Sequence, residues 1–191
     1  GKSFENVIRE AKCMIGPVVF SKNGEITGSF SNKKMPIETL FQEMTKEQIL
    51  FGGCINEEIR HDCEQKEIKV FDFMKMDDVA IYNAIATAEG AIMEAIKMQP
   101  INLHKSRCLV LGYGRCAKVL AAKLKGMDAQ VTVCARNKTA RSLARSFGLE
   151  VMDFTELKRR ICQYDYIFNT VPKQIIKEDI LRKISPFKMI A

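Results

Sequence analysis

The chain has 191 residues, of which 47% are hydrophobic and 28% charged, an ordinary composition for one or two globular domains. Its net charge of +7 comes from 30 Lys and Arg against 23 Asp and Glu, scattered without a nucleic-acid-binding motif, so we expect anionic small molecules rather than nucleic acid as partners. There is no uninterrupted run of 18 apolar residues, so we expect no membrane span.

The cysteines indicate where the protein works. There are seven of them, with no Cys-x-x-Cys pair, which is typical of a reducing cytoplasm rather than of a disulfide framework. Cys54, His61 and Cys63 match no zinc spacing, so we expect no metal site.

Residues 1–76 are predicted to form a partial α/β domain on the substrate side of the protein. Helical patterns cover residues 3–13, 37–44 and 56–65, and strand patterns cover residues 14–20, 48–51 and 67–73. The polar stretch between residues 21 and 36 is predicted to be a loop or an irregular hairpin.

A long helix is predicted over residues 77–98, with an apolar stripe at helical spacing made by Ile81, Ile85, Ala88, Ile92 and Ile96. Asn83, Thr87 and Gly90 are spaced to share one line of this helix, whereas Glu89 lies on another face. Two interpretations of that line stay open. It approaches a ligand or another backbone, or it belongs to a crossover helix with a few satisfied polar groups.

Residues 77–191 are predicted to form the linking helix and a dinucleotide-binding domain. Strands are predicted at 107–111, 130–135, 150–152, 165–169 and 187–191. A helix that ends at Gly126 is predicted after the first strand, and further helices at 139–147, 154–162 and 175–184. Strands that alternate with helices indicate a doubly wound parallel sheet. The chain supplies one mononucleotide half of such a sheet, so we expect it to be a fragment of a longer protein.

The strongest motif follows the first of these strands and reads Gly-x-Gly-x-x-Ala. Gly112 allows a tight turn, Gly114 allows a pyrophosphate to approach the backbone, and Ala117 allows close packing of helix on strand. Strand, glycines, helix and second strand come in the required order. The predicted cofactor-contacting residues of this turn are Gly112, Tyr113, Gly114, Arg115 and Cys116.

The end of the second strand indicates which dinucleotide binds. An NAD site places Asp or Glu there, but this chain has Arg136, Asn137 and Lys138. Two cations where a ribose 2′-phosphate would lie favour NADP over NAD. The alternative is that they are ordinary solvated loop charges.

Three further loops are candidates for ligand contact. Thr170, Val171 and Pro172 follow a strand of the same sheet and are predicted to line the cofactor, because ligands bind beyond the carboxyl ends of parallel strands. The plain alternative is a strand-to-helix turn. Gly52 and Gly53, and the pair Ser31 and Asn32, occupy comparable loops in the first domain.

The chain resembles the dipicolinate synthase A subunit family. The resemblance is carried by Asp77–Asn83 with Thr87–Gly90, Val110–Arg115, Val133–Arg136 and Asn169–Pro172, and more weakly by Phe30–Asn32 and Phe51–Gly53. The family usually has Pro before the Thr of the helix motif, where this chain has Ala86, so the presentation of Thr87 can differ.

The resemblance implies a two-domain NADP-dependent oxidoreductase that makes dipicolinate from a dihydro- or hydroxytetrahydro-dipicolinate. It implies a partner, the flavoprotein-like B subunit of dipicolinate synthase, together with a homo-oligomer and work in the mother-cell cytoplasm during sporulation. It places Ser31, Asn32, Gly52, Gly53, Asn83, Thr87 and Glu89 near the substrate, with Asn83 and Thr87 as candidates for the catalytic residues.

Two alternatives stay open. One is a related NAD(P)-dependent oxidoreductase of another small acid. The other is a nucleotide-binding subunit without chemistry of its own, because neither His61 nor His104 is placed like a hydride-transfer acid.

Overall fold

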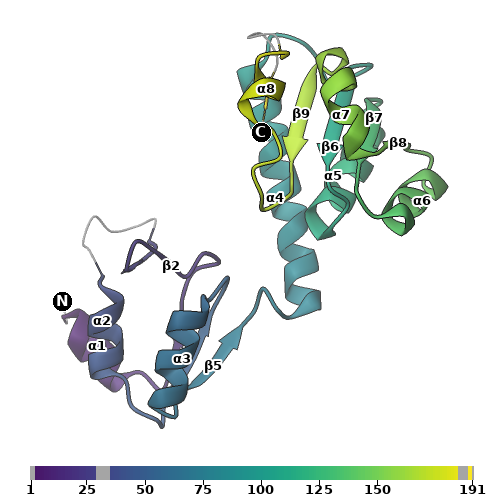
Figure 1. The fold of residues 1–191 in the computed structure, drawn as a ribbon. Helices are drawn as coiled ribbons and strands as arrows, with labels where there is room; N and C mark the ends of the chain where they lie inside the picture. The colour runs from purple at the N-terminus through teal and green to yellow at the C-terminus, as the bar shows by residue number, and fades with distance from the viewer. Residues whose placement is uncertain (1–2, 29–34, 185–188, 191) are drawn as a thin grey trace. The chain divides into compact units, whose positions relative to one another are not determined.

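The computed structural model describes residues 3–28, 35–184 and 189–190, so the predicted contacts of Ser31 and Asn32 lie outside the described residues. The chain divides into two compact units, Gly1–Ala80 and Ile81–Ala191 (Figure 1). Each unit has its own parallel sheet, as the alternation of strand and helix patterns predicts.

The first unit is built on a small sheet in the order β1-β4-β5. Its strands are β1 (Cys13–Ile15), β4 (Ile49–Gly52) and β5 (Lys69–Asp72), and its helices are α1 (Phe4–Glu10), α2 (Ile37–Glu43) and α3 (Glu57–Gln65). A two-stranded hairpin, β2 (Ser21–Lys22) and β3 (Glu25–Ile26), turns at Asn23 and Gly24, both with positive φ. The buried core of this unit includes Ile8, Phe20, Leu40, Leu50, Ile59 and Cys63.

The predicted strand over residues 14–20 is wrong beyond Ile15. The chain leaves the sheet at Gly16, and the following loop lies on the loop after β4, with the Gly53 amide donating to Pro17 O at 3.0 Å and the Phe20 amide donating to Gly53 O at 2.8 Å. Phe20 is buried in the core, although its neighbours Val18 and Val19 are exposed. A run of apolar residues therefore serves as a packed loop and not as a strand.

The second unit has a five-stranded sheet in the order β10-β9-β6-β7-β8, with all paired strands parallel. Its strands are β6 (Arg107–Leu111), β7 (Gln130–Cys134), β8 (Glu150–Met152), β9 (Tyr166–Asn169) and β10 (Met189–Ile190). Its helices are α4 (Asp77–Met98, which starts in the first unit), α5 (Arg115–Gly126), α6 (Lys138–Ser146), α7 (Phe154–Arg160), η1 (Ile161–Gln163) and α8 (Glu178–Leu181). Numbered from β6, this is the strand order 3-2-1-4-5 of a doubly wound dinucleotide-binding sheet. The expectation of a single mononucleotide half is therefore wrong, because β9 and β10 lie on the far side of β6 and belong to the second half.

Helices cover both faces of the larger sheet. Side chains of α4, α5 and α6 share one buried cluster with Cys108, Val110 and Phe168. Side chains of α7, η1 and the segment after β9 share the other with Leu109, Leu111 and Ile167. Because successive strand residues point to opposite faces, the apolar run of β6 is buried on both sides.

The predicted isoleucine stripe of α4 is wrong in part. Ala88 and Ile92 are buried as expected, but Ile81 and Ile96 are about half exposed, at 49% and 53%. The buried line instead continues through Ala84 and Ala95. Small side chains such as Ala88 and Ala95 let the helix lie close to the sheet, so the face of α4 that carries the alanines is the one buried in the core.

By length and composition alone, α4 is also apolar enough to cross a membrane, which the count of uninterrupted apolar residues did not indicate. Part of the helix packs into the core of the second unit, as core helices of the same composition do.

The predicted helix over residues 175–184 is also too long. The observed α8 has four residues and starts after Lys177, whose φ of −85° and ψ of 170° are extended. Ile175 and Ile176 precede it in irregular backbone, where they pack against the sheet core. Burial of these two side chains therefore outweighs the helical spacing of the sequence.

Candidate functional site

The site is organised by the turn that follows β6. Gly112 has a φ of +95°, and a Cβ added there would lie 2.9 Å from Thr170 Oγ1 and 3.0 Å from Val171 Cγ2. Its amide donates to Cys134 O at 2.8 Å, which joins the turn to the end of β7. Only glycine meets both the backbone and the space requirements at this position.

Gly114 is different, because a Cβ added there meets nothing within 4 Å. It is the N-cap of α5 and makes no side-chain cap to the first amides of this 12-residue helix, which have no partner within the helix. That is the arrangement in which a pyrophosphate binds a helix N-terminus, and the residues present fit such a group.

Thr170 closes the turn from the side of β9. Its hydroxyl donates to Leu111 O at 2.8 Å, and its amide makes a second bond to the same oxygen at 3.2 Å. The next residue is held too, since the Val171 amide donates to Asn169 Oδ1 at 3.1 Å. The predicted Thr170–Pro172 loop is therefore tied directly to the glycine turn.

A cavity of about 500 Å³ opens on one side of this turn. Gly112 and Tyr113 line it from the end of β6, and Arg136 and Asn137 line it from the end of β7. Burial raises the pKa of the Tyr113 hydroxyl, so this side chain is neutral. Lys138 is not among the lining residues; it is the first residue of α6.

Asn137 has a structural task as well. Its side-chain oxygen accepts from the amides of Thr139 at 2.7 Å and Ala140 at 3.3 Å and so caps α6. The side-chain oxygen of this cavity-lining residue therefore also holds the start of α6.

Arg141 supports the site through contacts that the sequence analysis did not predict. One of its terminal nitrogens donates to Ala135 O at 2.6 Å, to Arg136 O at 2.8 Å and to Asp153 Oδ2 at 2.7 Å. Asp153 also caps α7, and the amide of Thr155, followed by the Arg141 charge, lowers its pKa. Arg141 thus fixes the loop that carries Arg136. No sequence signal pairs it with Asp153, because the contact forms only once β7 and β8 lie side by side.

A second cavity, of about 360 Å³, opens on the other side of the turn. Thr87 of α4 lines it together with Cys116 and the loop Thr170–Pro172. The hydroxyl of Thr87 donates to Asn83 O at 2.9 Å, one turn earlier in the helix. Val171 lines both cavities, which therefore adjoin at the Thr170–Pro172 loop.

Two predicted substrate residues of α4 lie elsewhere. Asn83 does not line the Thr87 cavity. Glu89 pairs with Lys123 at 2.8 Å, beside a groove between α4 and α5. A Cβ added at Gly90 meets nothing within 4 Å, so no described backbone approaches it.

Gly52 and Gly53 have a packing role in the first unit. A Cβ on Gly52 would lie 2.6 Å from the Phe20 ring, and a Cβ on Gly53 would lie 2.3 Å from Val18 O. The loop is held further by Asp72, a buried carboxylate that accepts from the amides of Cys54 and Ile55, both at 3.1 Å. These contacts account for both glycines without a ligand.

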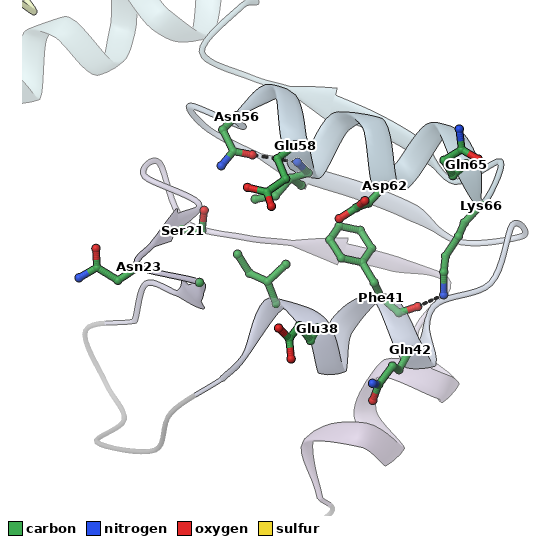
Figure 2. A pocket seen from close by; sticks show the side chains of 13 residues that line it. Ser21, Asn23, Glu38, Phe41, Gln42, Asn56, Glu58, Asp62, Gln65 and Lys66 are labelled. Carbon is green, nitrogen blue, oxygen red and sulfur yellow. Dashed lines mark hydrogen bonds between the residues drawn. The ribbon is translucent and has the colours of Figure 1, made fainter.

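The first unit has its own cavity, of about 520 Å³, between α2, α3 and the hairpin (Figure 2). Glu38, Glu58 and Asp62 lie on its walls, and the Lys66 ammonium group at one end donates to Phe41 O. Three carboxylates disfavour a dicarboxylate ligand, so we do not place the expected substrate there.

The histidines lie away from all of these cavities. His104 precedes β6, at the amino end of the strand, and its Nδ1 is 3.5 Å from Asp128 Oδ2. His61 is exposed on α3. Across the part of the chain that the structure describes, no group of three acidic, histidine or cysteine side chains is placed to hold a metal.

Comparison with known proteins divides the chain close to the boundary between its two compact units. Residues 1–74 match the family model of the N-terminal domain of the dipicolinate synthase A subunit. Residues 77–189 match a second family model, described as the D-isomer specific 2-hydroxyacid dehydrogenase, NAD binding domain.

Curated and solved relatives agree with these matches. The A subunit of dipicolinate synthase from Bacillus subtilis (strain 168) is 30% identical over 168 residues, which are 87% of this chain and 57% of the relative. A crystal structure of the Bacillus subtilis protein matches with a TM-score of 0.78 and 28% identity, covering 96% of this chain and 62% of that one. The crystal structure of the Bacillus halodurans counterpart gives 0.87 at 24% identity, covering 95% and 63%. The chain thus spans about three fifths of the length of each, and the expected resemblance is confirmed.

Proposed function

We propose a function from the premise that this chain belongs to the family of the D-isomer specific 2-hydroxyacid dehydrogenase NAD-binding domain, and carries an N-terminal domain of the type found in the dipicolinate synthase A subunit. The proposed activity is the NADP-dependent oxidation of a dihydro- or hydroxytetrahydro-dipicolinate to dipicolinate. The observation that supports it best is the glycine turn, which has open space at Gly114 and a cavity on each side.

The proposed cofactor contacts run across this turn. The amides at the start of α5 bind the pyrophosphate, with Tyr113, Arg115 and Cys116 around it. Arg136 and Lys138 supply positive charge for the ribose 2′-phosphate, because no carboxylate follows β7 to bind a free 2′-hydroxyl. The Thr87 cavity receives the nicotinamide, and Thr170–Pro172 closes over it.

The reaction creates an aromatic ring from a reduced one. A dihydro substrate loses one hydride and one proton, and a hydroxytetrahydro substrate loses one water as well. When bound at the glycine turn, NADP would supply the acceptor for that hydride. Thr87 holds the reacting end by polar contact from the cavity wall, and Asn83, one turn earlier on α4 and outside that wall, contacts the part of the substrate that extends beyond the cavity. The basic chain attracts the two substrate carboxylates.

The proposal extends to the setting of the reaction. The flavoprotein-like B subunit works with this chain, the chain forms a homo-oligomer, and the product is made in the mother-cell cytoplasm during sporulation. The curated relative is named as one subunit of a dipicolinate synthase, which supports the expectation of a second one.

One observation favours a different function. Neither histidine lies at the two cavities beside the glycine turn, and no Asp or Glu of the described residues lines these cavities. A nucleotide-binding subunit whose partner performs the chemistry needs no acid or base there. A related oxidoreductase of another small acid shares the cofactor site and differs only in substrate.

An ultraviolet assay separates these functions. The protein is mixed with a dihydro- or hydroxytetrahydro-dipicolinate and NADP, with and without the flavoprotein-like partner. An aromatic absorption band with NADP reduction by this protein alone supports the proposed oxidoreductase. A band that appears only in mixtures that contain the partner supports the nucleotide-binding function. NADP binding without a band in any mixture leaves another small acid as substrate.

The assignment of Thr87 and Asn83 has its own test. We expect Thr87→Val and Asn83→Ala to lower kcat about tenfold or more, with NADP affinity nearly unchanged, because a lost transition-state contact of about 1.4 kcal/mol is tenfold in rate. Unchanged turnover in both variants would remove the assignment.

A further inference from the structure

The cavity beside Arg136 has a third wall that the sequence analysis did not include. The segment after β9 contributes Val171, Lys173, Lys177 and further residues up to Ile180. Because β7, β6 and β9 are neighbours in one parallel sheet, the segments that follow them meet at the same edge. Residues nearly 40 positions beyond Arg136 therefore share its cavity.

The charged side chains that line this cavity are all positive. Arg136, Lys173 and Lys177 are its three charged lining residues, and none of the described lining residues is Asp or Glu. The two acids that follow Lys177 are engaged elsewhere, Glu178 with Arg182 at 2.5 Å and Asp179 with Lys158 at 2.6 Å. An anion that enters the cavity meets cations that no described carboxylate neutralises.

The rest of the cavity wall is suited to a nucleobase such as adenine. Most of it is formed by small and apolar side chains, among them Ala140, Phe154, Leu157, Val171, Ile175 and Ile180, and its uncharged polar residues are Tyr113, Asn137 and Gln174. A volume of about 500 Å³ lies within the usual range of small-molecule sites. An apolar wall with cations on it fits an adenosine that carries a phosphate group.

We propose that Lys173 and Lys177 bind the ribose 2′-phosphate of NADP together with Arg136, and so determine the preference for NADP. This rests on the proposed NADP function and adds to it a second chain segment. It also changes the expected partner of Arg136, because Lys138 is not on the cavity wall.

The expected effects follow from the exposure of these lysines. Both are exposed side chains, so each contact with a phosphate is partly screened by water and salt. Removing one positive charge should weaken NADP binding by about threefold to tenfold, since the phosphate carries close to two negative charges and accepts charge-assisted hydrogen bonds. NAD lacks this phosphate and should bind as before.

The test is calorimetric titration of the full 191-residue chain with NADP, NAD and adenosine 2′,5′-bisphosphate, at low and high salt. The variants are Lys173→Gln, Lys177→Gln, their double variant and Arg136→Gln. Lys183→Gln is the matched control, because it removes the same charge from the same segment but lies outside the cavity lining.

We expect each lysine variant to lose affinity for NADP and for the bisphosphate, with NAD affinity and the control unchanged. Loss of NADP preference in Arg136→Gln, with both lysine variants like the wild type, overturns this inference but keeps the NADP proposal. Equal binding of NADP and NAD by the wild type overturns the NADP proposal, and the inference with it. An equal loss in Lys183→Gln means a general charge effect and also overturns the inference.

Discussion

At the scale of single residues, the two glycines of the motif do different work. Gly112 needs its positive φ and has Thr170 Oγ1 beside it, so its role lies in the fold of the turn. Gly114 has a φ of −81° and open space, so its role lies in what approaches from outside. The motif joins a structural and a ligand-binding requirement within three residues.

The two substitutions should therefore separate stability from binding. We expect Gly112→Ala to lower the free energy of unfolding by about 1–3 kcal/mol, because the added Cβ is strained and crowded. Gly114→Ala should fold like the wild type but bind dinucleotide about tenfold more weakly or worse, since the Cβ occupies the pyrophosphate approach. Urea unfolding and calorimetric titration measure the two quantities. Equal effects of both substitutions on stability would contradict this division.

Part of the candidate site could be predicted from the sequence, and part could not. The order of strand, glycines and helix identified Gly112 and Gly114, because that motif depends on neighbours in sequence. Arg141 could not be identified, because its partner Asp153 lies 12 residues later, beyond the end of α6 and the strand β8. The packing role of Gly53 was equally hidden, since Val18 approaches it from a loop 35 residues earlier.

At the scale of elements, α4 shows how packing selects one face of an apolar helix. Its isoleucines and alanines both recur at helical spacing, and the sequence favoured the larger side chains. The structure buries Ala84, Ala88 and Ala95 and leaves Ile96 half exposed. The bounds of the helix were nevertheless predicted correctly, because they depend on local propensity and on Pro100 beyond its end.

Gly90 provides a test of this helix. It lies in the interior of α4 with nothing within 4 Å of an added Cβ, so Gly90→Ala should stabilise the protein by about 0.5–1 kcal/mol. Gly148 follows α6 with a φ of +69°, so Gly148→Ala should destabilise it by about 1 kcal/mol. The midpoint of urea unfolding should shift in opposite directions. Destabilisation by Gly90→Ala would mean that a group packs on this glycine.

At the scale of the whole molecule, the cysteines divide by burial. Cys63 lies in the core of the first unit, and Cys108 and Cys134 lie in the core of the second. Burial raises the pKa of the Cys63 thiol to about 11 and that of Cys108 and Cys134 to about 12. Cys13, Cys54 and Cys162 are exposed. Each unit thus carries a buried thiol that reports its own unfolding.

We expect an alkylating reagent at about pH 7.5 to label the three exposed cysteines quickly and the three buried ones only as denaturant is added, because the reactive form is the thiolate. Mass spectrometry of the labelled peptides gives the rate at each site. Raising the pH to about 9 should leave the buried sites slow, since burial holds the pKa of the Cys63 thiol at about 11 and that of Cys108 and Cys134 at about 12. Rapid labelling of Cys108 or Cys134 in native buffer would contradict the packing of the second unit.

By itself, the sequence determined the α/β class, the parallel sheet of the second unit, the bounds of most elements and the glycine turn. These follow from hydrophobic period, caps and turn residues, which act between neighbours in the chain. The tertiary structure alone decided which face of α4 is buried, why Gly52 and Gly53 are glycines, and that Lys173 and Lys177 share a cavity with Arg136. Those facts depend on strands that are adjacent in the sheet but distant in sequence, and a one-dimensional pattern carries no record of that adjacency.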